Sequence, residues 1–171
     1  MRKKKYTQSF RRWKVADMLG DAEATVRDIY PNISAAIDVP EEDALFCDRI
    51  HVTEVFVNII KNAAEAMGEK GMIGITGKYN KAQLKYKYQL QFEDSGEGID
   101  TDRVADVFKP YSSSKNREKN LGLGLSYCRN AIIAHGGRIF VVESVRGEGT
   151  TIGIDFPSRR VRCSAAAARD I

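Results

Sequence analysis

The sequence is poor in the residues that build disulfide frameworks and metal sites. Its 171 residues include three cysteines and two histidines. The cysteines, Cys47, Cys128 and Cys163, lie far apart without a Cys-x-x-Cys pair, and neither histidine falls at ligand spacing from them. A disulfide-built miniprotein and a zinc site are therefore excluded, and a reducing compartment is expected.

Long apolar runs are also absent. No stretch approaches the ~20 apolar residues of a membrane span. Residues 1–5 are basic and lead into polar residues rather than into the apolar region of a signal peptide. We therefore expect a soluble, cytoplasmic chain without direct membrane contact, and the anchorage of a full-length parent protein is left open.

The composition is that of one globular domain, with 43% hydrophobic and 29% charged residues. The net charge of +4 is unevenly distributed. Residues 1–14 carry seven Lys or Arg and no acid, whereas residues 15–157 carry 16 basic and 22 acidic residues. Basic ends on an acidic domain are typical of solvated termini, so nucleic acid is not an expected partner.

Hydrophobic periodicity predicts strands at residues 10–15, 33–39, 72–79, 84–93, 138–144 and 150–157. The clearest alternation is at 84–93, where one face is apolar and the other is wet. The last two strands form a hairpin around residues 146–149. Residues 44–47 are a short apolar piece to which the pattern assigns no element.

Capping and stop signals predict the helices. Asp17 is expected to cap a first helix that Pro31 closes, and Asp48 to cap the longest helix, which stops at Gly68. A short helix is expected at residues 102–108. A further helix is expected to open at residues 122–125 and to end at Gly136. Strands and helices mix without regular βαβ alternation, so the predicted fold class is α/β, a two-layer sandwich with a mixed β-sheet covered by about three helices.

The longest helix places its polar residues on one face. His51, Glu54, Lys61, Asn62 and Glu65 lie within about 60° either side of Asn58 on a helical wheel. An ordinary solvated face explains this pattern by itself. Two asparagines one turn apart are unusual in a helix interior, however, and their amides can offer oxygens to a hard cation and donors to phosphate.

A glycine-rich turn follows the strand at 84–93. Asp94 stands at the strand end, and Gly96 and Gly98 allow the backbone to pass close to a flat ligand. A solvated turn is the alternative. A carboxylate here has one role that fits a nucleotide, because it can accept the exocyclic amino hydrogens of adenine.

The segment Gly122-Leu123-Gly124-Leu125-Ser126 places glycines at a helix N-terminus, where free N–H groups favour phosphate. A dinucleotide fingerprint and a Walker-type loop are both excluded by spacing. The polar loop at 111–120 is a candidate lid over the phosphates, with a plain solvent loop as the alternative.

Taken in order, these pieces resemble the catalytic and ATP-binding domain of bacterial sensor histidine kinases, in the wider group that includes gyrase, Hsp90 and mismatch-repair ATPases. The resemblance covers residues 13–157 and implies a Bergerat-type fold. Residues 54–67 resemble the N box, 94–99 the G1 box, 107–111 the F box and 122–126 the G2 box. Residues 134–139 and 147–150 also fit. Asn120 stands where the G2 box often has a further glycine.

The resemblance implies a role for each site residue. It makes Asn58 and Asn62 the catalytic pair that holds Mg²⁺ and phosphates, and Asp94 the adenine ligand. The remaining ATP-binding residues it implies are Gly96, Gly98, Ile99, Tyr111, Lys115, Gly122, Leu123, Gly124, Leu125 and Thr150. The expected cofactors are ATP and Mg²⁺.

The acceptor histidine of such a kinase is missing from this chain. His51 begins the N-box helix and His135 belongs to a His-Gly-Gly turn, so both are expected to be structural. The implied partners are therefore a histidine-bearing dimerisation domain of the same kinase and the receiver domain of a response regulator. Residues 1–12 are a basic segment, the candidate end of a dimerisation helix; 13–158 are the ATP-binding catalytic domain and 159–171 a flexible tail.

Two other function classes remain open at this point. A degenerate module would keep the Asp94 pocket and bind nucleotide without transferring phosphate. A clamp ATPase of the gyrase or Hsp90 type would need a carboxylate to orient water, and Glu54 is the nearest one on the helix.

Overall fold

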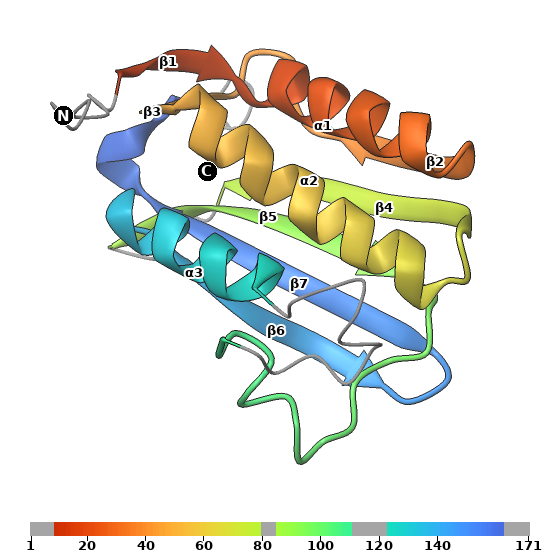
Figure 1. Ribbon diagram of the computed structural model, residues 1–171. Coiled ribbons are helices and arrows are strands. Elements are labelled where there is room, and N and C mark those ends of the chain that lie inside the picture. The colour runs from red at the N-terminus through yellow and green to blue at the C-terminus, as the bar shows by residue number, and fades with distance from the viewer. Residues whose placement is uncertain (1–8, 80–84, 111–122, 163–171) are drawn as a thin grey trace, which may run out of the picture.

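A computed structural model describes residues 9–79, 85–110 and 123–162. Its main sheet has the strand order β2-β4-β5-β7-β6, with β2 parallel to β4 and every other neighbouring pair antiparallel. Three helices, α1, α2 and α3, lie over one face of this sheet (Figure 1). The predicted two-layer sandwich on a mixed sheet is confirmed. The bounds are β2 Asn32–Asp38, β4 Lys70–Tyr79, β5 Tyr86–Asp94, β6 Arg138–Val145, β7 Gly149–Pro157, α1 Val15–Ile29, α2 Arg49–Ala66 and α3 Gly124–Ala134.

A second, three-stranded sheet lies at the end of the molecule where the described chain begins. It contains β1 (Phe10–Lys14), β3 (Ala44–Asp48) and β8 (Val161–Arg162) in the order β1-β3-β8. The sequence pattern assigned no strand to 44–47, because so short a piece shows no clear period. Residues 159–162, assigned from sequence to the tail, lie in the 3₁₀ turn Ser158–Arg160 and in β8.

Asp48 caps α2 as predicted. Its Oδ1 accepts hydrogen bonds from the Ile50 and His51 amides at 3.1 and 3.4 Å. The helix ends before Gly68, whose φ of 70° suits a glycine.

The predicted cap at Asp17 is wrong. Helix α1 begins at Val15, and its cap position, Lys14, makes no side-chain cap. The Val15 amide instead donates to the Asp43 carbonyl at 2.9 Å. Because a distant backbone carbonyl serves the first N–H, Asp17 falls inside the first turn.

The short helix predicted at 102–108 is also wrong. This segment is a series of turns, in which the amides of Arg103, Asp106 and Lys109 each donate to the carbonyl three residues earlier. These three bonds are of the i→i−3 type, and the segment is a run of turns rather than an α-helix.

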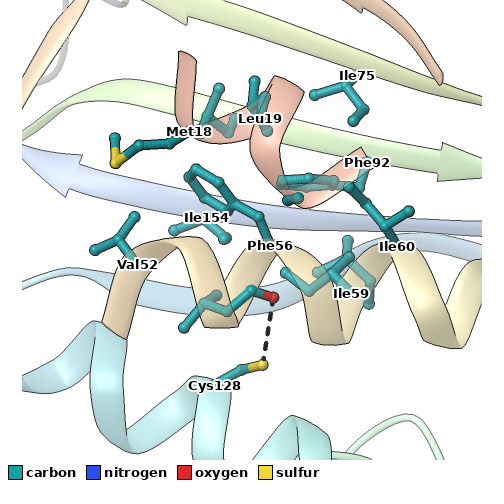
Figure 2. Packing of buried hydrophobic residues seen from close by; sticks show 14 of the residues in the cluster. Met18, Leu19, Val52, Phe56, Ile59, Ile60, Ile75, Phe92, Cys128 and Ile154 are labelled. Carbon is teal, nitrogen blue, oxygen red and sulfur yellow. Dashed lines mark hydrogen bonds between the residues drawn. The ribbon is translucent and has the colours of Figure 1, made fainter. Parts of the chain in front are cut away.

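The core lies between the helices and the main sheet. Figure 2 shows side chains of α1, α2 and the sheet meeting around Phe56, whose ring centroid lies 5.7 Å from that of Phe92. Tyr88, Leu90 and Phe92 on β5 are all buried, which confirms the predicted alternation. No helix in the described part of the chain is long and apolar enough to cross a membrane.

Candidate functional site

A cavity of about 690 Å³ opens between α2, the start of α3, the loop after β5 and the β6–β7 turn. Most of the predicted site residues line it: Asn58, Asn62, Asp94, Gly98, Ile99, Leu123, Gly124, Leu125 and Thr150. Gly96 is not among the lining residues. Tyr111, Lys115, Gly122 and Asn120 fall outside the described residues. The structure thus brings residues from four separate segments to one cavity, and the ligand of each stays a prediction.

The two asparagines form the wall of the cavity that faces α3. A Cβ added to Gly124 would lie 3.0 Å from Asn58 Oδ1 and 4.0 Å from Asn62 Nδ2. The Asn58 amide donates to the Glu54 carbonyl at 2.8 Å, which directs its oxygen away from the N-terminal end of α2. The absence of a side chain at Gly124 therefore lets the first turn of α3 lie directly against both amides.

Asp94 forms the opposite wall, at the carboxyl end of β5. The residue is 9% exposed, and Oδ1 accepts a hydrogen bond of 2.8 Å from the Gly96 amide. Thr150 on β7 is the register partner of Asp94 and is 8% exposed. A carboxylate and a hydroxyl thus lie side by side at the same depth of the cavity.

The glycines after Asp94 lie against other segments of the protein, and Gly98 also lines the cavity. A Cβ at Gly96 would lie 2.6 Å from that of Ala66, and one at Gly98, where φ is 70°, would collide with the Val145 carbonyl. The Glu97 amide donates to the Ala66 carbonyl at 3.1 Å, and the Gly147 amide to the Glu97 carbonyl at 2.8 Å. The glycines therefore fix the loop between the end of α2 and the β6–β7 turn.

The cavity has charged residues to which the sequence assigned no role. Lys61, Arg103 and Arg146 line it together with Glu65, Glu97 and Asp100. Arg146 and Asp100 form an ion pair of 3.0 Å across two loops. Lys61 and Glu65 were visible on the polar face of α2, but Arg103 and Arg146 lie in turns, where no periodicity marks a face.

Helix α3 is fixed to α2 by buried polar contacts. The Cys128 thiol lies 3.7 Å from the Val55 carbonyl (Figure 2), and burial raises the pKa of Cys128 to about 12. Tyr127 Oη lies 2.9 Å from His51 Nδ1, and burial raises the pKa of Tyr127. These contacts hold the start of α3 in place beside the asparagines.

His135 ties the far end of α3 to the cap of α2. The residue is 1% exposed. Nε2 accepts from the Asp48 amide at 3.1 Å, so Nδ1 carries the hydrogen and donates to the Ala131 carbonyl at 2.7 Å. Burial lowers the pKa of His135. Both ring nitrogens are engaged in structural hydrogen bonds.

Comparison with known proteins gives a family match and related sequences. The sequence profile of a family described as "Histidine kinase-, DNA gyrase B-, and HSP90-like ATPase" matches residues 47–160. The sensor histidine kinase ZraS of Escherichia coli (strain K12) is 33% identical over 79% of this chain and 27% of its own length. The chain therefore spans about a quarter of that curated relative.

Solved structures show the same fold. The catalytic domain of histidine kinase ThkA, in a nucleotide-free form, superposes with a TM-score of 0.72 at 25% identity, covering 87% of this chain and 95% of that one. A mycobacterial sensor histidine kinase, MprB, gives a TM-score of 0.77 at 21% identity over 90% of this chain and 100% of the other.

Proposed function

The chain belongs to the family of histidine kinase-, DNA gyrase B- and HSP90-like ATPases, and from this we propose that it is the ATP-binding catalytic domain of a cytoplasmic sensor histidine kinase module, spanning residues 13–158. The observation that supports this most strongly is a single cavity with Asp94 on one wall and the Asn58–Asn62 pair on another. Its volume lies within the ~300–1,000 Å³ usual for small-ligand sites.

Each wall suits one part of ATP. The Asp94 carboxylate accepts from the adenine amino group, and Gly98, Ile99 and Thr150 enclose the base. Backbone N–H groups at Leu123, Gly124 and Leu125 open α3 toward the phosphates, where a helix N-terminus favours an anion. Tyr111, Lys115 and Gly122 are proposed to complete the phosphate side, and Gly96 supports the base side from behind.

Asn58 and Asn62 are the proposed Mg²⁺ residues. Their amide oxygens are hard donors, and Mg²⁺ commonly keeps waters and substrate phosphates among its ligands. The described residues hold no cluster of three His, Cys, Asp or Glu that would bind a metal without the nucleotide. When bound, the cation would neutralise phosphate charge.

The proposed reaction transfers the γ-phosphoryl group to a histidine on a dimerisation domain of the same kinase. The bond between the γ-phosphorus and its bridging oxygen breaks, a phosphorus–nitrogen bond forms, and ADP leaves. The protein mainly positions groups and balances charge in such a transfer. A response-regulator receiver domain is the proposed next acceptor.

Calorimetric titration with ATP, with and without Mg²⁺, tests this function. We expect Asp94→Asn to weaken ATP binding by about 1–3 kcal/mol, because the amide presents a donor where the base also has one. Asp106→Asn is the matched control, since Asp106 is an exposed turn residue paired with Lys109 at 2.6 Å. Equal affinity of Asp94→Asn and wild type for ATP would show that the site is assigned wrongly.

A further inference from the structure

Ser144 on β6 joins three segments beside the Asp94 wall. Its Oγ accepts a hydrogen bond of 2.8 Å from the Ile99 amide. The same oxygen lies 2.8 Å from Thr150 Oγ1 and 3.3 Å from the Gly149 carbonyl. Ile99 and Thr150 line the cavity, whereas Ser144 contacts both and is not among the lining residues.

These contacts couple the direction of two hydroxyl hydrogens. A serine hydroxyl has one hydrogen, which goes either to Thr150 or to the Gly149 carbonyl. If it goes to Thr150, the Thr150 hydrogen is available to the cavity. If it goes to Gly149, Thr150 donates to Ser144 and presents only lone pairs to a ligand.

Asp94 and Thr150 lie side by side as register partners, so they meet neighbouring atoms of a bound base. The Watson–Crick edge of adenine offers a donor, the 6-amino group, directly beside an acceptor, N1. A carboxylate matches the first and a donating hydroxyl the second. Guanine and hypoxanthine present the reverse order, an acceptor at C6 and a donor at N1.

We propose that Ser144 is a positioning residue for base recognition: it donates to Thr150 and so turns the Thr150 hydrogen toward N1 of adenine. This inference rests on the proposed function, because it assigns a selectivity to the same pocket. Ser144 also holds Ile99, which keeps the loop closed on the base side. Thr150, oriented by Ser144, then donates to N1, while the Asp94 carboxylate accepts from the amino group.

The test separates these two contacts with altered nucleotides. Dissociation constants are measured for ATP, for 1-deaza-ATP, which lacks the N1 acceptor, and for purine riboside triphosphate, which lacks the amino group. Wild-type protein is expected to bind 1-deaza-ATP about tenfold more weakly than ATP. Ser144→Ala is expected to bind ATP about tenfold more weakly and to show no further loss with 1-deaza-ATP.

Three further variants complete the design. Ser144→Thr keeps the hydroxyl and is expected to keep the wild-type ratio. Ser144→Cys keeps the shape with a weaker donor and supplies the same readout if Ser144→Ala does not fold. Thr151→Ala is the matched control, because β-strand alternation places Thr151 on the opposite face of β7 from the cavity.

The outcomes are distinguishable. Loss of the N1 preference with an unchanged preference for the amino group supports the inference. If Ser144→Ala weakens the binding of all three nucleotides by the same factor, or of none of them, Ser144 does not orient the Thr150 hydroxyl. The inference then fails while the proposed function stands. Wild-type protein that binds none of the nucleotides would overturn the proposed function and the inference together.

Discussion

At the scale of single residues, the buried histidine shows how a motif residue acquires a structural role. His135 sits where its Nε2 is needed as an acceptor by the Asp48 amide and its Nδ1–H as a donor to Ala131. Only the neutral ring has both an acceptor and a donor nitrogen. Burial lowers the pKa of His135 because a charged ring would be desolvated there.

We expect this histidine to make stability depend on pH. The folded-state pKa lies below the unfolded value of about 6.5, so the contribution is fully present above pH 6.5 and is lost as pH falls toward the folded pKa. Below pH 6.5 the free energy of unfolding should decrease by up to about 1.4 kcal/mol per pH unit. Urea unfolding of wild type and His135→Gln between pH 5 and 7.5 measures this.

The control for this prediction is His51→Gln, which leaves the His135 contacts in place. It should change the slope little, because burial and not the charge of His51 is the largest cause of the lowered His135 pKa. His135→Gln should be less stable at pH 7.5 and show a flatter profile. A slope that is the same in both variants would contradict the assignment to His135.

At the scale of elements, the two aspartates that resemble caps differ in what surrounds them. Asp48 is 7% exposed, and besides its two bonds to α2 it accepts from the Ser9 amide at 3.2 Å through Oδ2. Asp17 is exposed within the first turn of α1, whose first amide is served by Asp43. The same residue type therefore caps one helix and contributes only charge near the other.

Alanine substitution of each aspartate separates these roles. Asp48→Ala should lower the free energy of unfolding by about 1–2 kcal/mol, because two helix N–H groups lose their acceptor. Asp17→Ala should cost less than about 0.5 kcal/mol, since only its interaction with the helix dipole is lost. Urea unfolding at pH 7 measures both, and equal losses would show that the cap assignments are wrong.

At the scale of the whole molecule, both histidines make structural hydrogen bonds. His135 is buried with both nitrogens engaged, and Nδ1 of half-buried His51 lies 2.9 Å from the Tyr127 hydroxyl. We therefore expect radiolabelled ATP to leave no acid-labile phosphate on the chain alone. Adding the dimerisation domain of its parent kinase should produce label on that domain, and label on His51 or His135 would refute this expectation.

Transfer and hydrolysis differ in what they need from the residue one helical turn before Asn62. Asn58 stands one turn before Asn62, and an amide cannot take a proton from water at neutral pH. Glu54 lies a further turn back, is exposed, and is not among the described residues that line the cavity. Its Oε1 lies 3.4 Å from Asn58 Nδ2.

We accordingly expect negligible release of phosphate from ATP by the chain alone, and the same rate in Glu54→Gln, in a coupled assay with MgATP. Asp17→Asn, a distant exposed carboxylate, serves as the matched control. Steady hydrolysis that disappears only in Glu54→Gln would favour the clamp-ATPase alternative.

Local patterns in the sequence determined the elements that carry the site. The period of β5, the cap at Asp48 and the asparagine spacing on α2 are all relations between residues a few positions apart, and the structure shows the predicted elements at each. The motifs and their order along the chain also predicted the family. They indicated which segments contribute to one site, but not the contacts between those segments. The sequence thereby anticipated that Asn58, Asp94 and Gly124 share a cavity.

Contacts between distant segments decided what local patterns do not encode. Residues 44–48 become a strand because β1 and β8 pair with them, and Val15 begins α1 because the Asp43 carbonyl is present. The glycines after Asp94 are needed by α2 and β6. The Ser144 hydroxyl reaches Ile99, 45 positions away, and its effect on Thr150 depends on the β6–β7 register. Such hydrogen bonds form only after the chain has folded, because their partners lie far apart in the sequence. No local pattern marks which residues will meet.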